Sequence, residues 1–490
     1  GGSHNTVFGG VSAAIVGGKC NCASGVGSTL GGGWCGRATG LESSLVGGHL
    51  NKSSGVRTFV GGGCRNLASG NYSTLGGGQE LSATAAHATA AGGCQNCASG
   101  AGGTVAGGIS GTAVACAFVG GGYCNRACSA KDTIVGGCNN TTTSAGCASF
   151  IGGGEHNCTC GVAKNSALAG GCCNIIAGEY GVLAGGIRNT MCQGATCASS
   201  FIGGGRNNCI RSCYSHNTIV AGLSNTMFEN ASASFIGGGQ DGRSWCHNTF
   251  VGGGHSLSAL GPISTTVGGY KNCVSSKHGV VVGGYCNCVS NDNGFIGGGC
   301  KNKIETSGNF GVIAGGMENT VCQDCATIGG GACNSACEDY TTIAGGFKNC
   351  ARNTGSVIGG GCENSNSGSC SFIGAGSNNC ATGCYASVAG GQSNCAGHAY
   401  TFIGTGNSNR TTGECAVVVG GQLNYAHGTR AFIGSGCRNT LSAAHAGAAA
   451  IGTGLNSVSG GMLHINSLFI TLSDLPTSDP GVDGVIWNSS

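Results

Sequence analysis

The stretch FVGGGCRN, residues 59–66, determines the fold of this chain, because close copies of it recur along nearly its whole length. Each copy has two apolar residues, two or three glycines, two variable residues and an Asn. Further copies are TIAGGFKN (342–349), VIGGGCEN (357–364), SVAGGQSN (387–394) and VVVGGQLN (417–424). Most copies are 15 residues apart. Helical repeats need about 30 residues or more, so this period predicts one coil of an all-β solenoid, a β-roll or β-helix, per copy.

The Asn that ends each copy serves as a register mark, and 30 copies can be placed from Asn5 to Asn456. Stacked coils would bring these amides into one column, where each side chain can donate to the next coil and satisfy its buried polar atoms. Clear members of this expected ladder are Asn66, Asn349, Asn364, Asn379, Asn394, Asn409, Asn424 and Asn439. In five copies the position is taken by Gly36, Leu81, Gly111, Gly242 and Leu257.

The glycines of the repeat and the lengths of its steps are both consistent with such a coil. The glycines three and four residues before the Asn are expected to permit corner conformations and close backbone approach that a Cβ would forbid. Several steps are 17 residues long, and we expect these insertions to bulge from a corner without disturbing the stack. At strand spacing, 30 coils predict a rod on the order of 140 Å long.

A Phe recurs seven residues before the Asn in many coils, and a Val or Ile follows it. This column contains Phe59, Phe118, Phe150, Phe201, Phe235, Phe250, Phe295, Phe372, Phe402 and Phe432. Neighbouring residues of a strand point to opposite faces, so one of each pair can fill the coil while the other forms an outward apolar stripe. Such a stripe implies a partner chain, and we expect a homotrimer. The alternative is a single-chain solenoid whose true turn comprises two 15-residue copies.

The composition excludes several classes of protein. Of 490 residues, 104 are Gly, 36 are Cys, three are Pro and 8% are charged. Collagen would need Gly at every third residue and abundant Pro. The Lys and Arg are scattered singly, whereas nucleic-acid binding needs clustered cations. No apolar run approaches the roughly 18 residues of a transmembrane helix. We therefore expect no nucleic-acid partner and no membrane span in this stretch.

The cysteines concentrate at four positions relative to the Asn: two before, one before, one after and three after. Side chains at these positions in successive coils are expected to lie near one another and to form many disulfides in an oxidising location. The candidate pairs are Cys22 with Cys35, Cys158 with Cys172, Cys273 with Cys286, Cys288 with Cys300, Cys322 with Cys333, and Cys350 with Cys362.

Catalytic, cofactor and metal sites are not expected. CNC and CQNC motifs resemble zinc half-sites, but a structural zinc needs four ligands in one tetrahedral cluster and these cysteines are spread along the chain. Two G-x-G-x-x-G matches, GGGWCG (31–36) and GGGQDG (237–242), lack a βαβ unit and a downstream acidic residue. No acidic pair stands out by its spacing as a general acid and base. We expect a protein that is not an enzyme.

The repeat resembles the head of trimeric autotransporter adhesins, whose coils carry a Ser, alternating apolar residues and a Gly followed by a small-residue turn. Here SFIGGG occupies 149–154, 200–205 and 234–239, with ASG turns at 68–70 and 98–100. The Gly-, Asn- and Ser-rich repeats of phage and large-virus fibres are similar as well. The resemblance is at the level of the repeat and implies a β-roll or β-helix and a surface fibre, without a particular receptor.

The pattern divides the chain into a repeat shaft of about 30 coils, 1–460, and a non-repeat segment, 461–490. The ending 475–490, with L-P-T-S-D-P and then W-N, is similar to a short ending of phage and marine-virus structural proteins. It can also act as a capping strand over the last coil.

From these features we expect a rigid, disulfide-stabilised fibre on a virion surface or in another extracellular, oxidising location. Its expected role is to contribute to host attachment through a host-surface glycan or receptor. The alternative is a bacterial surface adhesin or a glycan-binding solenoid module.

Overall fold

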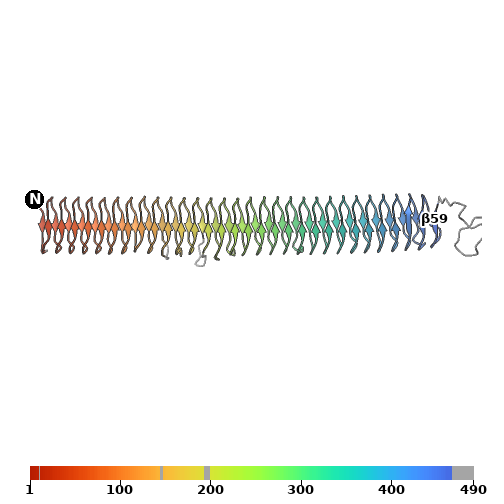
Figure 1. Cartoon of the computed structure of the whole chain (residues 1–490), viewed down its shortest axis with the longest axis horizontal. Coiled ribbons are helices and arrows are strands. Elements are labelled where there is room, and N and C mark those ends of the chain that lie inside the picture. Colours follow the sequence, from red (N-terminus) through yellow and green to blue (C-terminus); the bar gives the residue numbers. More distant parts are fainter. Residues whose placement is uncertain (10, 144–146, 192–198, 466–490) are drawn as a thin grey trace, which may run out of the picture. The chain divides into compact units, whose positions relative to one another are not determined.

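A computed structural model shows an all-β parallel solenoid of about 30 coils, which confirms the predicted fold class. It describes residues 1–9, 11–143, 147–191 and 199–465. The chain divides into two units, Gly1–Cys286 and Asn287–Ser490, and within each unit the strands stack one beside the next (Figure 1). No described segment forms a helix that is long and apolar enough to cross a membrane.

Each coil contributes one strand to each of two parallel sheets. Odd-numbered strands lie just after the Asn mark, and run from β1 (Thr6–Val7) to β35 (Cys273–Val274) in the first unit and from β37 (Cys288–Val289) to β57 (Thr440–Leu441) in the second. Even-numbered strands begin seven residues before the next mark, and run from β2 (Ala14–Ile15) to β36 (Val280–Val281) and from β38 (Phe295–Ile296) to β58 (Ala449–Ile451). Almost all of these strands are two residues long.

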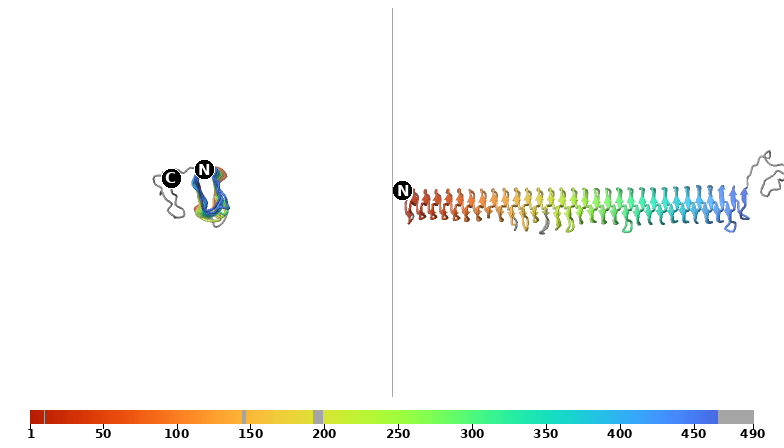
Figure 2. Two further views of the ribbon diagram at one scale, coloured as in Figure 1. Left: turned by 90° about the vertical axis from the view of Figure 1, so that its right-hand side faces the viewer. Right: turned by 60° about the horizontal axis from the view of Figure 1, so that its bottom comes forward.

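The pairing register fixes the length of a turn. Thr74 of β10 (Thr74–Leu75) pairs with Thr89, and Thr89 pairs with Thr104, so one turn comprises 15 residues. The alternative of a turn made from two copies is therefore wrong. In a 17-residue coil Phe150 still pairs with Ala167, because the two extra residues lie in the corner between an odd strand and the following even strand. Figure 2 shows such loops along one edge of the coils.

Each strand of a coil contributes one side chain to the coil's interior. Strand alternation predicts one inward residue in each pair, and the structure shows that it is the second, since Val60, Ile151 and Ile373 are fully buried. On the odd strands the inward residue is often Ala, as at Ala68, Ala83 and Ala98, which leaves room for Leu, Ile or Val from the even strands.

The eight predicted Asn residues are buried, and each takes the same place in its coil. Their hydrogen bonds go mainly to backbone groups rather than from amide to amide. Asn364 donates from Nδ2 to the carbonyls of Gly360 and Gly376, both at 2.9 Å, and its Oδ1 accepts the backbone N–H of Asn379 at 2.9 Å. A side-chain contact with the preceding coil, Nδ2 to Oδ1 of Asn349 at 3.1 Å, adds to these bonds. The column therefore ties backbone corners of three successive coils together.

The two corner glycines of this coil have different roles, and the prediction that both relieve steric conflict does not hold at Gly360. Gly361, three residues before Asn364, has a φ of 92°, and a Cβ there would collide with the carbonyl oxygen of Gly376 in the next coil. Gly360 faces open space, with no atom within 4 Å of a Cβ position. Its carbonyl accepts the Asn364 hydrogen bond, a role that any residue could fill.

The C-terminal segment begins with one more strand of the even-numbered sheet. β59 (Leu463–Ile465) pairs in parallel with β58. Residues 466–490, which include the ending compared above with viral structural proteins, lie outside the described residues.

Candidate functional site

The outer surface of the even-numbered sheet carries the predicted Phe column. Its ten rings belong to Phe59, Phe118, Phe150, Phe201, Phe235, Phe250, Phe295, Phe372, Phe402 and Phe432. All start an even strand and point outward, and Phe402 is 40% exposed while the next residue, Ile403, is fully buried. Phe235 and Phe250, in adjacent coils, stack with their centroids 5.3 Å apart. The structure thus places the column on one surface of each unit.

Each Phe of this column is followed two residues later by a Gly, and the ring lies across that Gly. A Cβ built on Gly374 would be 3.4 Å from Cε1 of Phe372, and the corresponding distance is 3.2 to 3.5 Å in the other nine coils. In the coils where Thr, Ser or Val takes the place of the Phe, seven residues before the Asn, the residue two further along is Gly, Ala or Val, as in Thr133 with Val135. A Gly thus accompanies every Phe of the column, and it leaves room for the ring to lie over the backbone.

The outer surface of the even-numbered sheet is uncharged. We call the outward residues of the even strands, seven and five before each Asn, the flat face; they are Phe, Thr, Ser, Val, Ala, Gly or Ile in the coils up to β58. The outer surface of the odd-numbered sheet differs, since it carries Arg37, Lys52, Arg126, Arg243 and Arg410. Charge is thus confined to other sides of the coil.

The pairing of Phe with Gly was missed by the sequence reasoning, although the signal is present. All ten copies with Phe in the column read Phe, Ile or Val, and then Gly. Glycine is so frequent in this repeat that the coupling is visible only when the two outward positions are read together.

The six predicted cysteine pairs are out of register in the structure, and no disulfide joins the members of any of them. The members of each pair are 11 to 14 residues apart in sequence, whereas register partners are usually 15 residues apart. Cys22 therefore pairs with Arg37 rather than Cys35, and Cys350 with Ser365 rather than Cys362. The members of the six pairs are two to four residues away from register, so they are not direct neighbours on adjacent strands. The predicted pairing is thus corrected.

The register brings other cysteines together on the outer surface of the odd-numbered sheet. Cys380 of β49 (Cys380–Ala381) pairs directly with Cys395 of β51 (Cys395–Ala396). Cys337 lies with its sulfur 3.9 Å from that of Cys350, and Arg352 donates to Cys350 at 3.0 Å. A hydrogen bond from the thiol of Cys158 lowers the pKa of Cys160 to about 7. The lowered pKa of Cys160 thus comes mainly from a neighbouring sulfur.

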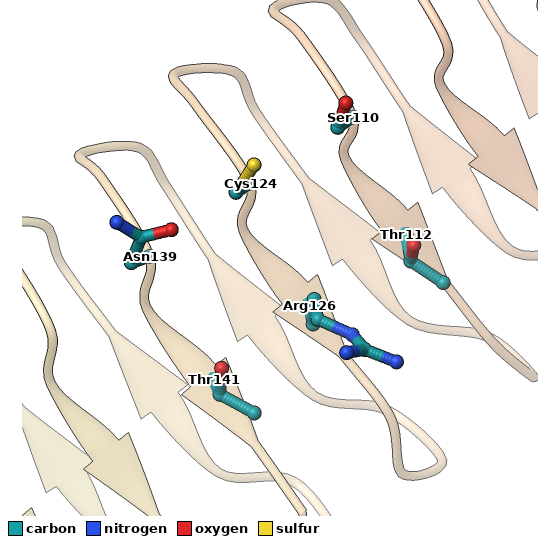
Figure 3. A pocket seen from close by; sticks show the side chains of 6 residues that line it. All are labelled: Ser110, Thr112, Cys124, Arg126, Asn139 and Thr141. Carbon is teal, nitrogen blue, oxygen red and sulfur yellow. The ribbon is translucent and has the colours of Figure 1, made fainter.

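A shallow hollow of about 450 Å³ lies on the same outer surface in the first unit (Figure 3). It is lined by side chains of three successive coils, with Arg126 of β17 (Arg126–Ala127) between Thr112 of β15 (Thr112–Ala113) and Thr141 of β19 (Thr141–Thr142). Ser110, Cys124 and Asn139 complete the lining. The hollow thus combines one cation with several hydroxyl and amide groups, a lining that can hold a polar, anionic ligand.

In the part of the chain that the structure describes, no group of three or more His, Cys, Asp or Glu residues is arranged to hold a metal ion. No protein-family model matches the chain, and no curated protein matches it.

Proposed function

We propose that this chain is a structural fibre protein that assembles with copies of itself through the flat face. The observation that carries the proposal is the uncharged surface in which ten Phe rings lie over ten glycines. Large contiguous apolar surfaces on soluble proteins mark sites of association. A stack of identical coils also suits a stiff spacer, because each coil contacts its neighbours alone and can be added without changing the rest.

The size of the flat face suits such an interface. In the first unit it runs over 18 even strands, from β2 to β36. Strands about 4.8 Å apart and a width of about 10 Å give an area of roughly 800 Å², close to what each partner buries in a standard protein–protein interface. Two copies of this chain would bring two identical uncharged faces together, which favours a second copy as the partner. The resemblance to trimeric adhesin heads makes a homotrimer our proposed stoichiometry.

Lysine in the flat face is expected to dissociate the assembly. In the double variant Phe235→Lys/Phe250→Lys, two ammonium groups would have to lose water when the face is covered, so sedimentation velocity should give the mass of one chain, 47.3 kDa. Arg243→Glu, on β31 (Arg243–Ser244) between these two strands but on the opposite sheet, is the matched control and should keep the mass of the parent. A parent chain that sediments as a monomer would refute self-association, and a dimer would refute the trimer.

The proposed location is the surface of a virion or another extracellular, oxidising site, where the fibre contributes to host attachment and has no catalytic role. Antibody labelling of the source particle in electron micrographs tests this. Label on projecting fibres supports the proposal, while label confined to the particle interior contradicts it.

The hollow around Arg126 favours a second candidate function, a glycan-binding module of a viral fibre or bacterial surface adhesin. The full chain is expected to bind acidic glycans on an array, and Arg126→Ala should weaken that binding at least tenfold because it removes the cation of the hollow. Arg37→Ala, in the same column of another coil, is the matched control. Equal losses in the two variants would indicate nonspecific charge attraction and contradict a site at Arg126.

A further inference from the structure

Cys380 and Cys395 are the first residues of consecutive odd strands and are direct register partners. Their backbone N–H groups donate to the carbonyls of Asn394 and Asn409 at 2.7 and 2.8 Å, so both positions are held in the sheet. Adjacent strands are about 4.8 Å apart, which lies within the Cα separation of about 4.4 to 6.8 Å that disulfides span. Both side chains point outward and are half-buried, while the following Ala381 and Ala396 are fully buried.

The two thiols differ chemically although they occupy the same column. A hydrogen bond from Cys380, with a smaller contribution from Arg410, lowers the pKa of Cys395 to about 7. The same hydrogen bond, followed by burial, raises the pKa of Cys380. Arg410 is the register partner of Cys395 in the next coil, so its guanidinium is placed beside the sulfur. The pair thus combines a nucleophilic sulfur with a protonated neighbour.

We propose that Cys380 and Cys395 form a reversible thiol–disulfide site that cross-links consecutive coils when it meets a small-molecule disulfide. The Cys395 thiolate attacks one sulfur of the oxidant, which forms a mixed disulfide and releases one thiolate. Cys380 then gives up its proton and attacks the Cys395 sulfur, which forms the intrachain bond and displaces the second thiol. Two cysteine thiols are oxidised, and one external disulfide is reduced to two thiols.

The cross-link differs from the predicted disulfides in its geometry. It joins register partners and therefore needs little backbone movement, whereas the predicted diagonal pairs would need the sheet to shift. Cys209 provides a matched comparison, because it occupies the same column in β27 (Cys209–Ile210) but pairs with Thr190 and Thr226. Its position in the coil is comparable, and its register partners are threonines.

The test treats the full chain with glutathione disulfide at pH 7.4, blocks remaining thiols and maps peptides by mass spectrometry without reduction. We expect a Cys380–Cys395 linked peptide, which chymotrypsin can separate at Tyr385. Cys380→Ser should instead accumulate the glutathione adduct on Cys395, and Cys395→Ser should remove the linkage. Cys209 should react at least tenfold more slowly than Cys395. Linkage of Cys380 to any other cysteine, or equal reactivity of Cys209 and Cys395, would overturn the proposal.

A second measurement does not depend on oxidation. The rate of alkylation of Cys395 should rise with pH to half its maximum near pH 7, and Cys380→Ala should move this midpoint upward because it removes the hydrogen-bond donor. An unchanged midpoint in Cys380→Ala would contradict the coupling of the two thiols. Because both side chains lie on the outer surface, each variant should remain folded, and circular dichroism checks this.

Discussion

Gly361→Ala is expected to lower the free energy of unfolding by about 3 kcal/mol or more, whereas Gly360→Ala should leave it within about 0.5 kcal/mol of the parent. The difference arises because Gly361 combines a φ of 92° with a carbonyl of the next coil at the place where a Cβ would lie. That carbonyl belongs to backbone that is itself held by the stack, so it cannot rotate away. Gly360 has open space around its Cβ position.

Guanidinium unfolding of the full chain, followed by circular dichroism, measures this difference, and limited proteolysis locates it. The variant Gly361→Ala should shift the unfolding midpoint and open new cleavage sites near the altered corner. Gly360→Ala serves as the control, since the two variants add the same methyl group to neighbouring residues. Equal midpoints for the two variants would show that the corner relaxes, and would contradict the steric role assigned to Gly361.

Much of this fold could be predicted because a solenoid converts a sequence period into a spatial one. The 15-residue spacing predicts the turn, and strand alternation predicts that one residue of each pair is buried, which the structure shows to be Ile403 and not Phe402. These two inferences depend on the local chain alone. They do not require knowledge of how the corners are folded.

Contacts between columns were harder to predict, because they depend on the register between coils. Cys322 and Cys333, which the sequence predicts to be neighbours in successive coils, lie four residues out of register once the 15-residue turn is applied. Cys337, 15 residues after Cys322, is its true neighbour. The same limit applies to the Asn column, where the conformation of the corner decides that the amide meets backbone carbonyls.

Asn364→Asp is expected to be among the most destabilising isosteric changes in this chain. The Nδ2 of Asn364 faces two carbonyl oxygens, and a carboxylate would place an acceptor where two donors are needed, in a buried position. We expect a loss of more than about 3 kcal/mol at neutral pH. Asn364→Leu should cost less, about 1 to 3 kcal/mol, because it leaves backbone groups unpaired without burying a charge. The chain itself uses Leu81 and Leu257 in this column.

The two variants should also differ in their response to pH, which separates the burial of a charge from a loss of shape. In Asn364→Asp, burial and the facing carbonyls would raise the pKa of the introduced carboxyl group in the folded state above its unfolded value, about 3.9. The folded state is then favoured when this group is protonated, so its stability should be greatest below about pH 4 and fall as the pH rises through the folded pKa. Measured relative to the parent at each pH, Asn364→Leu should show no such trend. If the two variants lost equal stability at every pH, the amide would be acting through its shape, and the hydrogen bonds assigned to the column would not be what joins the coils.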